Sequence, residues 1–351
     1  MNPKITVLMS VYNGEKYLHE AIDSILNQTY KNFEFLIMND ASTDSSREII
    51  LSYDDPRIIL VDNERNLGLA SSLNKGIYLA KGEYIARMDA DDISLSHRLQ
   101  TQVDFMDNHP ETGICGSGIK CFGNSEELIK FSTNYEINYT LLFHNQLAHA
   151  TVIMRKSLLE KFKLKYDENI LYAQDYELWT RCLELFQIVN LPDVLLLYRV
   201  HSSGASVAKF TSQMNIANEI RKKMLERIGI YPTSEELAIH NAISNRIYEY
   251  NHIFLKKMED WLLKLKKYNE IEKIIDISSF NQLLETMWIA ACKDMAKYNA
   301  ASLNDLLKSS LNNNISVREK LKFLFIMFLG KINYYKIYHY YNGGNHVKKF
   351  I

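Results

Sequence analysis

Hydrophobic residues in the first half of the chain follow two alternating patterns. Continuous apolar runs, typical of strands buried on both faces, occur at 5–11, 33–38, 58–61 and 84–88. Residues 18–26 and 69–80 instead carry apolar side chains three and four positions apart, which indicates amphipathic helices. This alternation of strands and helices predicts an α/β fold with a parallel sheet.

Polar residues gather where three of these strands end, at 12–14, 39–44 and 89–92. The carboxyl ends of parallel strands meet at one edge of a sheet, and ligands of open α/β sheets bind there. We therefore expect the three loops to converge on a ligand. The sequence Ser-Ser-Arg-Glu at 45–48 is typical of a capping box and predicts the start of a second helix.

The α/β pattern continues with a helix to Asn108 and a strand at 114–121, and 122–145 is less regular. From about residue 208 only helical periodicity remains. With 351 residues the chain is long enough for two units. The sequence predicts an α/β domain over 1–207 and a helical region over 208–351.

Composition excludes several classes of protein. A net charge of −1 argues against a general nucleic-acid binder. The four cysteines form no C-x-x-C pair, which favours buried thiols in a reducing compartment, and we expect a cytoplasmic protein. The N-terminal apolar run is short and soon becomes polar, so neither a signal peptide nor a spanning helix is expected there.

The most chemically informative stretch follows the strand at 84–88, where Asp89, Asp91 and Asp92 crowd into four positions. Side chains two apart on an extended chain share a face, so Asp89 and Asp91 can point into one crevice. Hard oxygen ligands suit Mn²⁺ or Mg²⁺, which complete their coordination with water and phosphate oxygens. The cluster predicts a metal and a phosphate-bearing ligand. The alternative is an acidic turn that caps the next helix.

Several motifs together resemble the family 2 glycosyltransferases with the GT-A fold. The resemblance extends over roughly residues 4–205 and rests on five stretches of sequence: Val-Tyr-Asn-Gly at 11–14, Ser-Ile-Leu-Asn-Gln-Thr-Tyr at 24–30, Asn-Asp-Ala-Ser-Thr-Asp at 39–44, Asn-Leu-Gly-Leu-Ala at 66–70 and Met-Asp-Ala-Asp-Asp at 88–92. It implies a GT-A (Rossmann-like) domain that uses a UDP-sugar donor and Mn²⁺ or Mg²⁺.

The resemblance also assigns roles to single residues. Tyr12 and Asp40 would bind the uracil base, Asn66 would lie beside the nucleoside, and Asp89 would lie near the ribose. Asp91 and His201 would ligate the metal. The full set of expected donor contacts is Val11, Tyr12, Asn13, Asp40, Asn66, Asn74, Asp89, Ala90 and Arg199. One departure is that Leu73 precedes Asn74 where the family often has an arginine.

A second chemical stretch lies at 171–181. Inverting glycosyl transfer needs a carboxylate that takes the proton of the attacking hydroxyl. By its position in the family motif this base is Asp175, although Gln174 replaces the usual glutamate before it. The alternative for Asp175 is a helix N-cap. Trp179 would either stack on a sugar or belong to the core, and His149 would either contact the acceptor or make a structural hydrogen bond.

Arg199 and His201 alternate along a predicted strand, so both can face one side. A guanidinium and an imidazole there suit a diphosphate and its metal. The resemblance accordingly assigns a phosphate contact to Arg199 and metal ligation to His201.

The C-terminal segment combines a short apolar stretch at 321–329 with tyrosines and lysines that follow it. This composition fits a peripheral anchor on an anionic membrane. The alternative is a helix that packs on the catalytic domain or in a homodimer.

The function predicted from the sequence is metal-dependent transfer of a hexose or N-acetylhexosamine from a UDP-sugar to a cell-surface glycan. The acceptor would be a glycan or a lipid-linked oligosaccharide at the inner face of the cytoplasmic membrane. Two alternatives are a sugar nucleotidylyltransferase and a non-catalytic nucleotide-sugar or glycan binder. The chain lacks the Gly-rich, lysine-bearing N-terminal loop of the former, and the presence of Asp91, Asp175 and His201 argues against the latter.

Overall fold

The computed structural model describes residues 2–123, 128–129, 137–201, 210–298, 301, 303–312, 318 and 320–328. The chain divides into two compact units, residues 1–224 and 225–351. This division lies inside helix α9 (Phe210–Arg227), beyond the boundary that composition suggests. The first part of α9 groups with the sheet because Arg221 Nε donates a 2.6 Å hydrogen bond to the carbonyl of Phe143.

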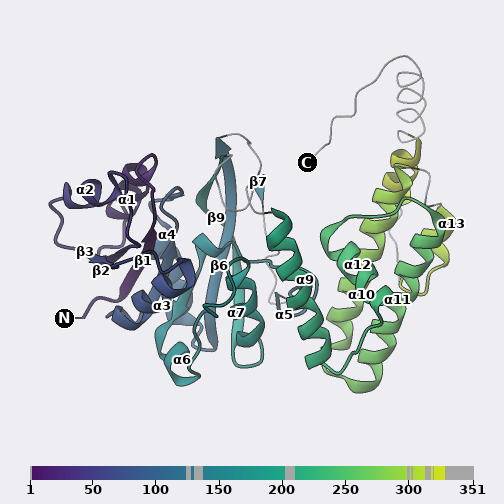
Figure 1. Ribbon diagram of the computed structural model, residues 1–351. Helices are drawn as coiled ribbons and strands as arrows, with labels where there is room; N and C mark the ends of the chain where they lie inside the picture. The colour runs from purple at the N-terminus through teal and green to yellow at the C-terminus, as the bar shows by residue number, and fades with distance from the viewer. Residues whose placement is uncertain are drawn as a thin grey trace, which may run out of the picture. The chain divides into compact units, whose positions relative to one another are not determined.

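Unit 1 is an α/β domain (Figure 1). Its strands are β1 (Ile5–Val11), β2 (Phe33–Asn39), β3 (Ile58–Asp62), β4 (Tyr84–Met88), β5 (Ile93–Ser94), β6 (Thr112–Gly123), β7 (Leu128–Ile129), β8 (Ile153–Arg155) and β9 (Gln187–Val200). Its helices, besides α9, are α1 (Leu18–Leu26), α2 (Ser46–Leu51), α3 (Leu69–Leu79), α4 (Arg98–Asn108), α5 (Ile137–Thr140), α6 (Lys156–Lys161) and α7 (Gln174–Cys182), with a 3₁₀ turn at His149–Thr151.

The strands form one mixed sheet in the order β3-β2-β1-β4-β8-β6-β9-β5, and β7 pairs with β6. The strands β1 to β4 are parallel, as the alternation of strands and helices predicts. β8 runs antiparallel between β4 and β6, and β5 runs antiparallel to β9. The long β9 therefore returns to the carboxyl end of β4, where the aspartates lie.

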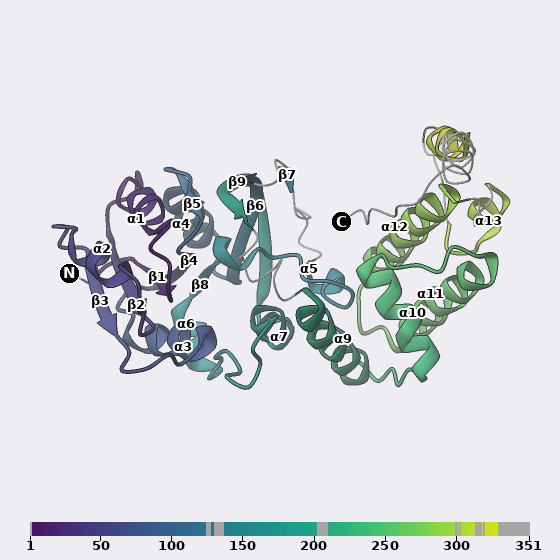
Figure 2. The same cartoon turned by 45° about the horizontal axis from the view of Figure 1, so that its top comes forward.

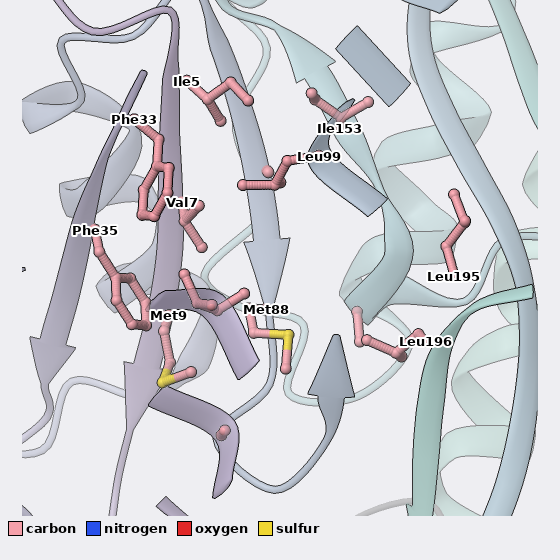
Figure 3. Close-up of a cluster of buried hydrophobic side chains, with 14 of the residues drawn as sticks. Ile5, Val7, Met9, Phe33, Phe35, Met88, Leu99, Ile153, Leu195 and Leu196 are labelled. Carbon is pink, nitrogen blue, oxygen red and sulfur yellow. The ribbon is translucent and has the colours of Figure 1, made fainter. Parts of the chain in front are cut away.

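Helices cover both faces of the sheet: α1 and α4 lie on one side, and α3, α6 and α7 on the other (Figure 2). On the α1/α4 side, alternate residues of β1, β2 and β4 form a buried core with Leu99 of α4 and Ile153, Leu195 and Leu196 from β8 and β9 (Figure 3). The opposite face of β4 carries Arg87, which is also buried. The strand that delivers the carboxylates thus has an apolar side and a charged side.

Unit 2 is helical in the residues that the structure describes. Its helices are α10 (Ser234–Asn245), α11 (His252–Glu272), α12 (Ile277–Ala296) and α13 (Leu303–Lys308). α11 packs on α10 and α12 through apolar residues that include the buried Trp261 and Trp288. Among the described residues, no helix combines the length and the apolar character that crossing a bilayer requires.

One local prediction is wrong. α2 does begin after Ser45, but the Ser45 side chain does not cap it, so the capping box expected at 45–48 does not form. Instead the Ser45 amide donates to Glu15 and the Ser46 amide donates to Asp44, because the loop after β1 lies against this helix start. The segment that begins at His149 opens with a 3₁₀ turn, and its strand is confined to Ile153–Arg155.

Candidate active site

Three carboxylates follow β4 directly. Ligand atoms of Asp89, Asp91 and Asp92 lie within 4.8 Å of one another, so the cluster read from the sequence forms in space. The chain then continues into β5 rather than into a helix. Helix capping is therefore not the reason for the acidic residues.

Asp89 and Asp91 each contact a side chain of opposite or potentially opposite charge. Asp89 forms an ion pair with Nη1 of Arg87, whose side chain is only 3% exposed. Oδ2 of Asp91 lies 2.9 Å from Nε2 of His201, just beyond β9. Burial raises the pKa of Asp91, the nearby Asp89 charge raises it further, and His201 opposes both. A cation at this position would relieve the crowding of negative charge.

Asp92 is the least exposed of the three aspartates. Its Oδ1 accepts a 2.8 Å hydrogen bond from the amide of Arg199, while Oδ2 is buried with no hydrogen-bond partner among the described residues. Burial, followed by the neighbouring carboxylates, raises the pKa of Asp92 well above its usual range. An incompletely satisfied buried carboxylate beside two others is a donor set that fits Mn²⁺ or Mg²⁺.

Arg199 ties the end of β9 to this cluster. Its Nε donates to the Asp91 carbonyl at 2.8 Å, and its Nη2 lies 2.9 Å from Glu20. The guanidinium also lies 4.3 Å from the ring centroids of both Tyr17 and Phe122. Arg199 therefore orders the loop after β4 through its own contacts, and a phosphate contact by the same group stays a prediction.

The acidic cluster opens onto a cavity of about 520 Å³. Asp89 and Asp91 line it from the end of β4, and Asp175 lines it from the start of α7. The predicted metal ligand Asp91 and the predicted base Asp175 thus share one space, although they lie far apart in sequence.

Asp175 is positioned by the first turn of α7. The N-cap residue is Ala173, in a left-handed conformation with φ 57°, and no side chain caps the helix. Asp175 consequently is not the N-cap. Its Oδ2 accepts a 2.8 Å hydrogen bond from Asn145 Nδ2. Burial raises the pKa of Asp175, and hydrogen bonds and the Arg87 charge oppose that rise. The buried Gln174 also lines the cavity, so the position before Asp175 is uncharged.

His149 and Trp179 lie beneath the cavity. Nε2 of His149 lies 2.7 Å from the Tyr166 hydroxyl, and burial lowers the pKa of His149 well below its usual range, so the ring is neutral. The indole of Trp179 is fully buried and packs edge-on to the His149 and Tyr166 rings. Trp179 is therefore a core residue here, and its faces offer no stacking surface for a sugar. His149 lines the cavity and makes the structural hydrogen bond.

Asn74 hydrogen-bonds to the backbone of Tyr166, and its expected contact with the donor stays a prediction. Its Oδ1 accepts from the Tyr166 amide at 2.9 Å, and its Nδ2 donates to the Tyr166 carbonyl at 3.0 Å and to Glu168 at 2.9 Å. These bonds occupy the carboxamide. The side chain fastens the 166–168 segment to α3.

Asp40 also has an internal role that the sequence did not indicate. It is 2% exposed, its Oδ1 accepts from the Asn63 side chain and the Leu67 amide, and its Oδ2 accepts from the Gly68 amide. Asp40 thus shapes the loop that carries the exposed Asn66. Direct contact of Asp40 with a base stays a prediction.

The loop after β1 is linked to the loop after β2. Asn13 has φ 52°, and its side-chain oxygen accepts from the Thr43 amide at 2.8 Å. This arrangement leaves the Tyr12 ring 52% exposed, while Val11 is buried and Ala90 is half-buried. An exposed aromatic ring on an ordered loop is suited to stack on a base, as expected of Tyr12.

Two residues that pair with carboxylates of the cavity, Arg87 and Asn145, were not predicted from the sequence. Arg87 had a visible signal, because an arginine inside an otherwise apolar buried strand requires a partner or a function. Asn145 had none, since it lies in an irregular stretch and meets Asp175 only through the tertiary fold.

Comparison with known proteins relates this chain to glycosyltransferases. The family model for glycosyl transferase family 2 matches residues 6–164. The Escherichia coli protein WfgD, a UDP-Glc:alpha-D-GlcNAc-diphosphoundecaprenol beta-1,3-glucosyltransferase, is 30% identical over 230 residues, which cover 64% of this chain and 89% of WfgD.

Solved structures share the fold. TarS 1-349 of S. aureus in complex with UDP-GlcNAc has a TM-score of 0.55 at 18% identity, covering 98% of this chain and 93% of that one. The mannosyltransferase PcManGT from Pyrobaculum calidifontis, in complex with GDP-Man and Mn2+, has a TM-score of 0.52 at 18% identity, covering 88% and 89%. The α/β unit therefore has the predicted GT-A fold, and a helical region follows it. The chain belongs to glycosyltransferase family 2.

Proposed function

We propose that this glycosyltransferase is metal-dependent and inverting, and that it moves a hexose or N-acetylhexosamine from a UDP-sugar to a hydroxyl of a growing cell-surface glycan. The observation that carries the proposal is the shared cavity, onto which the Asp89 and Asp91 carboxylates and the Asp175 carboxylate all open. A donor diphosphate needs a cation, which Asp89 and Asp91 could hold at one wall of the cavity. An acceptor hydroxyl needs a base, which Asp175 could supply at the other wall.

The carboxylates divide the chemistry between them. Asp91 and His201 would hold Mn²⁺ or Mg²⁺, which when bound offsets charge on the leaving diphosphate. Asp175 accepts the proton of the acceptor hydroxyl as its oxygen bonds to the anomeric carbon. The bond from that carbon to the diphosphate breaks on the opposite face, and UDP leaves with the electron pair, which inverts the configuration. The exposed Tyr12 ring would cover the uracil base.

The acceptor that we propose is lipid-linked, and the enzyme would act at the inner face of the cytoplasmic membrane. WfgD is named for a diphosphoundecaprenol-linked acceptor, which supports a lipid carrier here. In the helical residues 320–328, the side chains of Leu321, Leu324, Phe325 and Phe328 are exposed along one edge. Residues 329–351 lie outside the described residues. In sequence, 318–351 contain seven basic residues and one acidic residue, which suits an anionic leaflet.

The test is turnover of a panel of UDP-sugars with a diphosphate-lipid acceptor, with and without Mn²⁺. Asp91→Asn should lose transfer and Mn²⁺-dependent UDP binding, because the amide removes a metal-binding charge. Asp175→Asn should keep UDP binding but lower kcat by about 10²-fold or more, the scale of a general base. Asp193→Asn, on an exposed position of β9, is the matched control. Full transfer by Asp175→Asn would refute the assignment of the base.

A further inference from the structure

Asn145 makes a fixed bridge to Asp175. Its Oδ1 accepts a 3.0 Å hydrogen bond from the Leu147 amide, and its Nδ2 donates to Oδ2 of Asp175 at 2.8 Å. Only the amide nitrogen can donate to a carboxylate, and only the amide oxygen can accept from a backbone N–H. Both bonds therefore require the same orientation of the carboxamide, and each supports the other.

The segment that carries Asn145 is itself anchored to the helices beside it. The Tyr176 hydroxyl, next to Asp175 on α7, donates to the Leu141 carbonyl, and Arg221 on α9 donates to the Phe143 carbonyl at 2.6 Å. Hydrogen bonds from α7 and α9 therefore hold the stretch of chain just before Asn145 in place. A carboxylate held in this way loses less freedom when it engages an acceptor hydroxyl.

Other groups around Asp175 come from separate elements. Arg87 of β4 lies close enough that its charge favours the ionised carboxylate. Burial raises the pKa of the Tyr166 hydroxyl, after α6, so this group stays neutral. His149 is neutral, because its pKa is depressed. The backbone amide of Tyr176 hydrogen-bonds to the carboxylate, and Asn145 adds a side-chain hydrogen bond.

We propose that Asn145 is a positioning residue, which holds Oδ2 of Asp175 and so orients this carboxylate toward the acceptor hydroxyl. The inference rests on the proposed role of Asp175 as base. A hydrogen bond donated to the ionised form favours that form, so the same bond keeps the base deprotonated at lower pH. Removing the donor should therefore raise the pKa of Asp175 and move the acid limb of the rate profile to higher pH.

The experiment measures kcat and acceptor KM against pH for the full-length enzyme, together with UDP binding by calorimetry in the presence of Mn²⁺. For Asn145→Ala we expect kcat to fall about tenfold, the scale of one hydrogen bond to a charged group, with UDP affinity unchanged. Its acid limb should move upward by about one pH unit. Asn145→Asp keeps the acceptor for the Leu147 amide and places a second carboxylate beside Asp175, so its acid limb should move further upward.

Asn169→Ala is the control, because the exposed Asn169 side chain hydrogen-bonds to nearby Asp167 and its loss should leave the profile unchanged. An Asn145→Ala enzyme with a wild-type acid limb and kcat would overturn the inference. Loss of UDP binding equal to the loss of kcat would overturn it too, because it would show a general structural role. Failure of the proposed function is distinguishable, since Asp175→Asn would then transfer at the wild-type rate.

Discussion

Replacing Arg87 with methionine tests how the acidic cluster is balanced when no ligand is present. The substitution keeps an unbranched side chain of similar length and removes the guanidinium that pairs with Asp89. Arg87 is almost completely buried, whereas the Asp89 side chain is 31% exposed and can be partly rehydrated. Three carboxylates within 4.8 Å would then face one another with less positive charge nearby.

The expected loss of stability follows from the different burial of Arg87 and Asp89. Removing one partner of a fully buried ion pair costs about 3–5 kcal/mol. Partial exposure of Asp89 reduces that cost, and so does loss of the buried Arg87 Nε, which has no hydrogen-bond partner among the described residues. We therefore expect Arg87→Met to lower the free energy of unfolding by about 2 kcal/mol. Added Mn²⁺ should restore more stability to this variant than to the wild type, since the cation takes over the missing charge.

The assay is urea unfolding at pH 7 with and without Mn²⁺, which gives free energies from the transition midpoint and slope. The control is Arg47→Met, because Arg47 pairs with Asp62 at the surface with side chains 48% and 42% exposed. Such a pair contributes about 0–1 kcal/mol. A midpoint for Arg87→Met no lower than that of Arg47→Met would refute the reasoning, as would equal Mn²⁺ stabilisation of variant and wild type.

Two further predictions concern the fold and the C-terminal helix. Gly82→Ala should destabilise the sheet by about 3 kcal/mol in urea unfolding, because a Cβ there would overlap the backbone of Ile5 and Thr6, which cannot rotate away. The exposed neighbour substitution Lys81→Ala should be nearly neutral, and equal stability of the two variants would contradict this account. In the full chain, replacing Phe325 and Phe328 with aspartate should weaken sedimentation with anionic vesicles at least about tenfold, since each buried Phe contributes about 1.5–3 kcal/mol. Phe323→Leu, at a buried position of the same helix, is the control, and unchanged sedimentation of the aspartate variant would exclude the membrane proposal.

Much of the fold could be predicted because its signals are local. Continuous apolar runs marked β1 to β4, and helical spacing marked α1 and α3, with ends that differ from the structure by a residue or so. The two-residue strand β5 was missed, since so short a segment carries no periodicity. The expected capping box failed because tertiary contacts from the first loop supplied other partners to the helix start.

The candidate site could be predicted only in part. The aspartate cluster and Asp175 were found because their motifs are short and contiguous. Trp179 is buried in the core and cannot stack on a sugar. The sequence left both roles open, because burial cannot be read from one residue's position on a helix. Asn74 likewise turned out to hold Tyr166, a residue 92 positions away.

The sequence by itself determined the order of strands and helices, the acidic loop after β4 and the family to which the chain belongs, because each of these depends on neighbouring residues. Only the tertiary structure decided which polar groups meet. Asn145 reaches Asp175 across 30 positions, and the Arg199 amide reaches Asp92 across 107. Such pairs leave no periodic trace, since a hydrogen bond or an ion pair depends on where the sheet order places two strand ends, and that order results from the packing of the whole domain.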